Sequence, residues 1–283
     1  MLNELENLPL ISANIRKSVI EAVYHAGSGH PGGSLGIVEL LTALYFKEMK
    51  IDPKNPKDPN RDRFVLSKGH CSPALYGALA ERGFFPKEDI KTFRKIDSYL
   101  QGHPSMRHVP GVDMSTGSLG QGVCAANGMA LAAKMDKKDY RVYSILGDGE
   151  LQEGQVWEAA MFAPHYKLDN LCIMIDNNGL QIDGDVDKVM RVCSIADKFR
   201  AFNWNVIEIN GHDFGEIFAA FDSARAYKGK PTAIIAKTIK GKGVSFMENV
   251  AGWHGMAPNT EQYQQAIKEL NAEIIKLGGV IND

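Results

Sequence analysis

Apolar residues along the chain follow two periodicities that alternate with each other. Short apolar runs predict buried β-strands at 63–67, 142–146, 171–175, 206–209 and 232–238. Stripes with helical spacing predict helices at 12–26, 36–48, 72–82, 87–96, 119–135, 188–201, 213–227 and 259–277. Ser12 is the expected cap of the first helix. This alternation predicts an α/β fold, a doubly wound and mainly parallel sheet with helices on both faces, and we expect one domain over 1–283.

Two of the predicted strands end in small side chains that carry oxygen. The letters GDG (147–149) follow the run 142–146, and DNN (176–178) follow the run 171–175. Ligands of open parallel sheets bind at the carboxyl ends of the strands, so we expect Asp148 and Asn178 to lie close together. A carboxylate and an amide oxygen suit magnesium, which usually also takes phosphate oxygens from its ligand. The pattern therefore predicts a site for magnesium and a diphosphate.

Composition excludes several classes of protein. The formal net charge is −2, and no basic block indicates nucleic-acid binding. No apolar run approaches the roughly 20 residues of a membrane helix, and the N-terminal segment lacks a signal-peptide pattern. Cys71, Cys124, Cys172 and Cys193 show no metal-ligand spacing, which favours buried, reduced thiols in a cytoplasmic protein.

Other glycine-rich segments need a separate interpretation. The letters GSGHPG (27–32) satisfy GxGxxG, but they follow a predicted helix, whereas the dinucleotide fingerprint follows a strand. We therefore reject NAD binding there. Lys240 and Lys242 in KTIKGKG lack the P-loop spacing; they either meet a phosphate or flank a flexible loop, and both stay outside the predicted site. The small residues of the helix at 119–135 indicate either tight packing on the sheet or contact with a cofactor or another subunit.

Five motifs occur in an order typical of one family. They are SGHPGG (28–33), DRFVLSKGH (62–70), GHPSMRHVPGVDMSTGSLGQG (102–122), GDGELQEGQVWEA (147–159) with NN at 177–178, and WHG (253–255). GDG followed by NN resembles the thiamine-diphosphate signature, and the longer motifs are similar to those of the transketolase family. The resemblance spans nearly the whole chain. It implies the diphosphate-binding domain of the thiamine-diphosphate-binding fold, and transfer of a two-carbon ketol unit from a ketose phosphate to an aldose phosphate.

The resemblance also implies roles for individual residues. His30 and His254 would handle the hydroxyl proton of the donor, His103 would bind its terminal hydroxyl, and His70 would lie near the diphosphate. Imidazole suits such proton transfer near pH 7. Thiamine diphosphate would be contacted by His70, Gly117, Leu119, Gly147, Asp148, Gly149, Asn178 and His254.

The implied metal ligands and interface residues complete the predicted site. Asp148, Asn178 and the carbonyl of Leu180 would hold Mg²⁺, for which Ca²⁺ or Mn²⁺ can substitute. Glu153 and Glu158 would lie at a subunit interface, or would be glutamates that favour the positive end of a helix. Ser118 stands where many relatives have proline, which makes that turn less rigid.

The length of the chain departs from the family pattern. The pyrimidine-binding and C-terminal domains of transketolases have no counterpart here, which implies the N-terminal subunit of a split enzyme, active only with a second polypeptide in an α2β2 assembly. One alternative is a split ketol transferase for an unusual sugar phosphate. Others are the α subunit of a 2-oxoacid dehydrogenase or a relic that binds its partner without catalysis. The combination of GHPGG, FVLSKGH and WHG argues against the 2-oxoacid dehydrogenase. The intact Asp148, Asn178 and four histidines argue against the relic.

Overall fold

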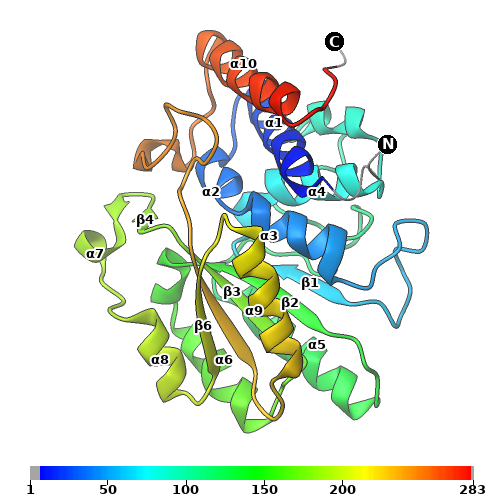
Figure 1. Ribbon diagram of the computed structural model, residues 1–283, viewed down its shortest axis with the longest axis vertical. Helices are drawn as coiled ribbons and strands as arrows, with labels where there is room; N and C mark the ends of the chain where they lie inside the picture. Colours follow the sequence, from blue (N-terminus) through cyan, green and yellow to red (C-terminus); the bar gives the residue numbers. More distant parts are fainter. Residues whose placement is uncertain (1–6, 282–283) are drawn as a thin grey trace.

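Five parallel strands form the central sheet of the computed structural model, which describes residues 7–281 (Figure 1). The spatial order is β1-β2-β3-β7-β6, and all four neighbouring pairs are parallel. The predicted parallel α/β fold is confirmed. The strands of this sheet are β1 (Arg63–Leu66), β2 (Val142–Gly147), β3 (Leu171–Asn177), β6 (Asn205–Asn210) and β7 (Thr232–Lys237).

A second, antiparallel pair of strands was not predicted. It joins β4 (Leu180–Gln181) to β5 (Gly184–Asp185). Strands of two residues are too short to show an alternating apolar pattern. The pair lies at one side of the molecule, beyond the end of β3 (Figure 1).

Alternate side chains of the strands face two separate cores. In β3, Cys172 and Met174 belong to one core, whereas Leu171, Ile173 and Ile175 belong to the other. All five side chains are fully buried. Burial on both faces explains why this strand appears in the sequence as a continuous apolar run.

Helices cover both faces of the sheet (Figure 1). The first core contains residues from α1 (Leu8–Ala26), α3 (Val38–Ala43), α4 (Ser72–Arg82), α9 (Phe214–Ala226) and α10 (Thr260–Lys276). The second contains residues from α5 (Gln121–Met135), α6 (Gly154–His165) and α8 (Ile195–Ala201). Two short helices, α2 (Pro31–Leu35) and α7 (Val186–Val189), lie nearer the carboxyl ends of the strands.

Some predicted helix boundaries were wrong. The first helix starts at Leu8 and not at 12; Asn7 caps it by accepting a hydrogen bond from the amide of Leu10 (3.2 Å). Ser12 lies inside the helix, where its hydroxyl bonds to Thr42 (3.0 Å). The segment predicted as one helix at 36–48 begins as α3 and ends in a π-helical turn, Leu44–Glu48.

Two other predicted helices are shorter than expected. Residues 87–96 form only a 3₁₀ turn, Lys87–Thr92. Residues 188–201 are interrupted, because Cys193 adopts a positive φ of 62° between α7 and α8. A residue with a β-carbon in that conformation cannot continue a right-handed helix. Apolar spacing alone did not reveal either change.

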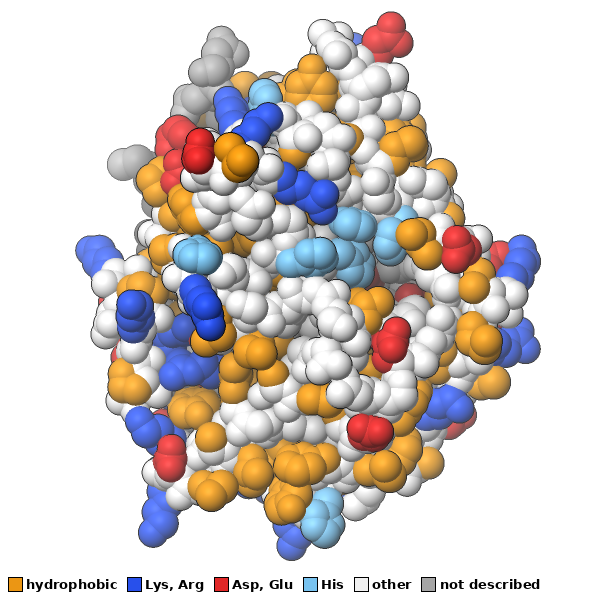
Figure 2. Space-filling view, turned by 180° about the vertical axis from the view of Figure 1, so that it is seen from behind, with side chains coloured by type: hydrophobic (Ala, Val, Ile, Leu, Met, Phe, Trp, Pro, Cys, Tyr) orange, Lys and Arg blue, Asp and Glu red, His pale blue; other side chains and the backbone are white. Residues whose placement is uncertain are grey.

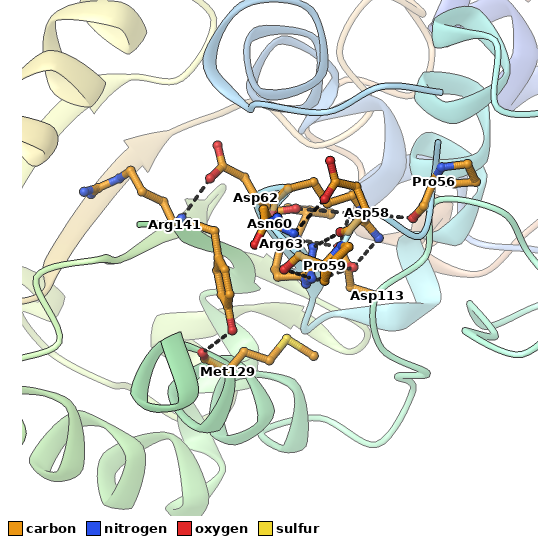
Figure 3. A network of polar contacts seen from close by, with 12 residues as sticks. Pro56, Asp58, Pro59, Asn60, Asp62, Arg63, Asp113, Met129 and Arg141 are labelled. Atoms are coloured by element: carbon orange, nitrogen blue, oxygen red, sulfur yellow. Dashed lines mark hydrogen bonds and ion pairs between the residues drawn. The ribbon is translucent and has the colours of Figure 1, made fainter. Parts of the chain in front are cut away.

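A polar network fixes the proline-rich loop before β1 (Figure 3). The guanidinium of Arg63 donates to the carbonyls of Asp58 (3.3 Å) and Pro59 (3.0 Å). Asp113, from the long loop 97–118, accepts from the amide of Phe64 (2.8 Å). Asp62 accepts from the amide of Arg141 (2.8 Å), just before β2. These bonds fix the amino ends of two neighbouring strands.

The small residues of α5 pack tightly against the sheet. A β-carbon on Gly122 would lie 2.6 Å from the Cα of Ser67, whereas one on Gly128 would meet nothing within 4 Å. We expect Gly122→Ala to lower the free energy of unfolding by about 1–3 kcal/mol, because backbone must move to relieve the overlap. Gly128→Ala in the same helix should raise it by about 0.5–1 kcal/mol. Urea unfolding of both variants checks this, and equal effects would contradict it.

The structure also bears on membrane helices, the N-terminal segment and the cysteines. No helix within residues 7–281 combines the length and the apolar character needed to cross a membrane. The first six residues of the segment tested for a signal peptide lie outside the described residues. All four cysteines are free; Cys71 and Cys172 are buried as predicted, Cys124 is partly buried, and Cys193 is exposed, so the prediction was wrong there.

Candidate functional site

One cavity of about 450 Å³ opens at the carboxyl ends of the central strands. Figure 2 shows histidine side chains gathered near the middle of one face of the molecule. The cavity brings together every predicted site residue except Glu158. They are His30, His70, His103, Gly117, Leu119, Gly147, Asp148, Gly149, Glu153, Asn178, Leu180 and His254.

Three of the histidines form a compact group. The ring centroids of His30, His70 and His254 are separated by 5.1 Å, 5.4 Å and 5.2 Å. The Nδ1 atom of His30 is buried and has no hydrogen-bond partner. His103 packs against Gly117, where a β-carbon would lie 2.9 Å from its ring. An unsatisfied buried nitrogen at the wall of a polar cavity fits a ligand that carries hydroxyl groups.

Burial and positive neighbours keep these histidines neutral. Burial lowers the pKa of His30 to about 4, with help from His70 and Arg94. The pKa of His70 and of His254 falls to about 3, through burial and then through Lys68 or Lys240. Burial also lowers the pKa of His103. Near pH 7 each ring therefore has one N–H donor and one acceptor nitrogen.

We expect His30, His70 and His254 to show no titration between pH 8 and pH 5 in the cofactor-free chain, which NMR of the imidazole protons would measure. Because their folded pKa values lie below the ordinary 6.5, the unfolded state binds more protons between about pH 6.5 and 4. The free energy of unfolding should therefore fall as the pH falls through this window. His70→Gln should make that fall shallower in urea unfolding. A titration midpoint near 6.5 for the cavity histidines would contradict the prediction.

Oxygen atoms from two strand ends form a candidate metal site. Asp148 accepts hydrogen bonds from the amides of Gly149 (2.8 Å) and Gly179 (2.5 Å). Asn178 accepts from the amide of Leu180 (2.9 Å) and donates to Asp176 (2.9 Å), which fixes its side-chain amide. Burial, together with Asp176, raises the pKa of Asp148 to about 6. A bound cation would stabilise that buried charge, so the donor set fits magnesium.

This donor set differs from a cluster of charged ligands. Within residues 7–281 no three His, Cys, Asp or Glu side chains are placed to hold one metal ion together. The predicted set instead combines the carboxylate of Asp148, the amide oxygen of Asn178 and the carbonyl of Leu180. Hard oxygen ligands of this mixed kind are typical of magnesium and calcium.

A buried ion pair lies at the floor of the cavity. Lys68, which follows β1, contacts the carboxylate of Asp176 at the end of β3, and both side chains are at most 3% exposed. Thr238 also donates to Asp176, and Lys68 donates to the carbonyl of Gly33 (3.1 Å). Burial alone would raise the pKa of Asp176, but Lys68 and these hydrogen bonds lower it. The carboxylate of Asp176 therefore stays charged and connects β3 with the residues that follow β1 and β7 (Thr232–Lys237).

A second buried lysine has no such partner. Lys240 is 2% exposed and lines the cavity, where its ammonium lies 3.2 Å from Nδ1 of His254. Among the described residues no carboxylate lies within 4 Å of it. Burial and the charge of Lys68 lower its pKa. A buried cation without a paired anion fits a negatively charged ligand.

Glu150 connects the loops around the cavity. Its carboxylate accepts from the hydroxyl of Ser67 (2.5 Å) and from the amides of Gly120 (2.9 Å) and Gly147 (3.0 Å). Ser67 follows β1, Gly120 precedes α5, and Gly147 is the last residue of β2. Burial raises the pKa of Glu150, although these bonds favour its charged form. The side chain holds in place the turn that carries Gly117 and Leu119.

The sequence of the chain matches one protein family over almost its whole length. Residues 9–274 match the family model described as transketolase, thiamine diphosphate binding domain. The chain belongs to the transketolase family. Members of this family with related sequences are transferases.

Two relatives have nearly the same extent as this transketolase-family chain. It is 47% identical to a protein from Phocaeicola vulgatus that is named as one subunit of an apulose-4-phosphate transketolase, over 97% of each chain. It is 50% identical to 6-deoxy-6-sulfo-D-fructose transketolase subunit SqwG from Clostridium sp., over 92% of this chain and 94% of that protein.

Single-chain transketolases are matched over less than half of their length. The Homo sapiens transketolase is 42% identical over 96% of this chain, which is 43% of that protein. The crystal structure of the Campylobacter jejuni transketolase superimposes with a TM-score of 0.88 and 35% identity, over 98% of this chain and 46% of that one.

Three charged residues that shape this transketolase-family cavity were missed by the sequence prediction. Lys68, Glu150 and Lys240 all line the cavity. Lys68 could have been found, because it directly follows a buried strand, the place where ligands bind. Lys240 could not have been found in this way, because it lies in a lysine- and glycine-rich segment typical of exposed loops. Lys242, from the same segment, lies outside the cavity and pairs with Glu248 (3.4 Å).

The two glutamates predicted at an interface are both exposed in this transketolase-family chain. Glu153 lines the cavity and immediately precedes α6, without a side-chain capping bond, while Glu158 lies within that helix and outside the cavity. Neither is in the first turn of a helix, so the alternative of first-turn glutamates was wrong. Their interface role stays a prediction.

Proposed function

We propose that this chain is the diphosphate-binding subunit of a two-chain transketolase dependent on thiamine diphosphate and magnesium. It would be active with a partner that supplies the pyrimidine-binding and C-terminal domains, in an α2β2 assembly in the cytoplasm. The observation that carries the proposal is that one cavity holds four histidines, an unpaired buried lysine and the Asp148–Asn178 pair. The near-complete overlap with two proteins named as transketolase subunits supports the split arrangement.

Different residues of the cavity would hold the metal ion, the diphosphate and the aminopyrimidine ring of the cofactor. Asp148, Asn178 and the carbonyl of Leu180 would hold Mg²⁺, and Lys240 would offset the charge of the diphosphate. Gly117 and Leu119 would face the aminopyrimidine ring. When bound, thiamine diphosphate supplies the electron sink for carbon–carbon cleavage.

The histidines would act on the sugar. His30 is neutral, so one ring nitrogen can accept the hydroxyl proton of the donor while the other donates. His254 is neutral as well; its Nδ1 accepts from the ammonium of Lys240, so its Nε2–H would donate to the same hydroxyl. The unpartnered Nδ1 of His30 supplies a free hydrogen-bonding position for a hydroxyl. His103, whose ring packs against Gly117, would bind the terminal hydroxyl, and His70 would lie near the diphosphate.

The choice of sugar separates two candidate functions. One is ketol transfer between ordinary ketose and aldose phosphates; the other is transfer from an unusual sugar phosphate or sulfonate. The second is favoured by higher identity to the proteins named for apulose 4-phosphate and 6-deoxy-6-sulfofructose, 47% and 50%, than to the human transketolase, 42%. Both would use the same residues of this chain.

A reconstitution assay tests the proposal. The chain, alone and mixed with the polypeptide encoded beside it, would receive thiamine diphosphate, Mg²⁺ and ribose 5-phosphate. The donors would be xylulose 5-phosphate, fructose 6-phosphate, apulose 4-phosphate and 6-deoxy-6-sulfofructose. Turnover only in the mixture supports the split enzyme, and the best donor decides between the two functions. Cofactor-dependent assembly without turnover of any donor would overturn the ketol-transfer assignment.

A further inference from the structure

A buried charged network lies behind one wall of the cavity without lining it. Glu39 of α3 accepts hydrogen bonds from the guanidinium of Arg16 (2.6 Å and 2.7 Å), and its other contact is Nδ1 of His212 (2.9 Å). The side chains of all three are at most 12% exposed. Burial alone would raise the pKa of Glu39, but Arg16 and His212 lower it to about 2. Glu39 is thus a permanently charged group in the core.

Both partners of Glu39 continue to the same short segment. The Nε2 atom of His212 accepts from the amide of Ile239 (2.9 Å), so the proton of this ring is on Nδ1 and is donated to Glu39. The Nε–H of Arg16 donates to the carbonyl of Lys242 (2.9 Å). Arg16 and His212, which both bind Glu39, therefore contact the backbone on either side of Lys240.

The segment between these contacts has little freedom to move. The amide of Gly241 donates to the carbonyl of Gly32 (2.8 Å), and a β-carbon on Gly36 would lie 3.0 Å from the carbonyl oxygen of Ile239. In contrast, among residues 7–281 the ammonium of Lys240 has one hydrogen-bond partner, His254. Its direction is therefore set by the backbone that carries it and by the packing of its stem beside Gly32, which the Gly241–Gly32 bond holds in place.

We propose that Glu39 is a positioning residue for anion binding: through Arg16 and His212 it fixes residues 239–242 and so directs Lys240 toward the diphosphate. The inference rests on the proposed function, in which that lysine meets the cofactor. Holding a long side chain in its bound conformation reduces the ordering cost of binding. Removing the charge of Glu39 should thus weaken the binding of the cofactor, although no atom of Glu39 lines the cavity.

The first experiment compares two buried carboxylates. Titration of thiamine diphosphate into the complex of both chains with excess Mg²⁺, followed by calorimetry, gives the Kd. Glu39→Gln should raise the Kd about tenfold, the lower end of what loss of a supporting hydrogen bond costs at such sites. The matched control is Glu48→Gln: Glu48 is 5% exposed and contacts Arg225 and Tyr143, which are not part of the network around residues 239–242. Its Kd should stay within about twofold of wild type.

A double-variant cycle shows whether the effect passes through Lys240. Lys240→Met should raise the Kd by itself, and adding Glu39→Gln should cause no further rise. A purely structural role of Glu39 would weaken binding equally in both backgrounds. Hydrogen exchange of residues 238–249 without cofactor gives an independent readout: Glu39→Gln should speed it, and Glu48→Gln should not.

A pair of substitutions at His212 keeps the test valid if Glu39→Gln does not fold. In His212→Gln the side-chain amide oxygen can replace the accepting Nε2 and should preserve the Kd; in His212→Asn it cannot reach Ile239, and the Kd should rise. If Lys240→Met weakens binding while Glu39→Gln and His212→Asn do not, the inference is overturned and the proposed function stands. If Lys240→Met leaves the Kd unchanged, the diphosphate role of that lysine fails, and the inference with it.

Discussion

Asp148→Asn should abolish magnesium-dependent binding of thiamine diphosphate. The substitution removes the only carboxylate of the proposed metal site while keeping the size of the side chain. The loss should be at least about 100-fold in cofactor affinity, or about 3 kcal/mol, because a metal ion contributes several kcal/mol of charge stabilisation. Calorimetric titration of the complex of both chains, with and without Mg²⁺, measures it.

The fold should survive this substitution. Since the folded pKa of Asp148, about 6, lies above its ordinary 3.8, the free energy of unfolding of the cofactor-free chain falls as the pH rises from about 3.8 to about 6, and the full cost of burying the charge is present above that. Asparagine removes the cost of burying the charge next to Asp176 but loses one acceptor for the amides of Gly149 and Gly179, so the two effects oppose each other. Asp183→Asn, on the exposed turn between β4 and β5, is the matched control and should keep full affinity. Magnesium-dependent affinity retained by Asp148→Asn would exclude this metal site.

Lys68→Met should cause the largest loss of stability among single substitutions near the cavity. It leaves the carboxylate of Asp176, which is fully buried, without its cation. Breaking a buried pair from one side costs about 3–5 kcal/mol, a large part of the total stability of a domain. Urea unfolding at pH 7, followed by tryptophan fluorescence, measures the loss.

The double variant separates charge from packing. Lys68→Met with Asp176→Asn should be clearly more stable than Lys68→Met alone, because no unpaired charge remains. The deficit of Lys68→Met should also shrink as the pH falls, because without Lys68 burial raises the pKa of Asp176 above its ordinary 3.8 and the carboxyl takes up a proton. Lys87→Met, which breaks an exposed pair with Glu81, should cost at most about 1 kcal/mol. A pH-independent deficit would contradict the role of the charge.

The sequence allowed the sheet and most of the cavity to be predicted for physical reasons. A strand such as 171–175, apolar on both faces, can only be buried in a sheet covered on both sides. Polar residues directly after such strands, including Asp148 and Asn178, must then meet at one edge. The same logic applied to Lys68 would have added it to the site.

Other features depend on packing between distant segments. Lys240 is buried because Gly32 and His254 pack around a segment whose letters are typical of a surface loop. Glu39 is the one charged residue of α3, and the approach of Arg16 and His212 explains it. Ser12 has the composition of a cap but bonds to Thr42 on another helix. Local pattern contains no information about these partners.

The strand order has a consequence for synthesis of the chain. β7 is the last strand of the main sheet to leave the ribosome, yet it lies between β3 and β6. Until it emerges, β3, which is apolar from Leu171 to Ile175, has one unpaired edge and β6 has no neighbour. Open edges of this kind are templates for wrong pairing between chains. The nascent chain is therefore most exposed to aggregation while residues 178–237 are being made, and this is the interval in which a chaperone would protect it.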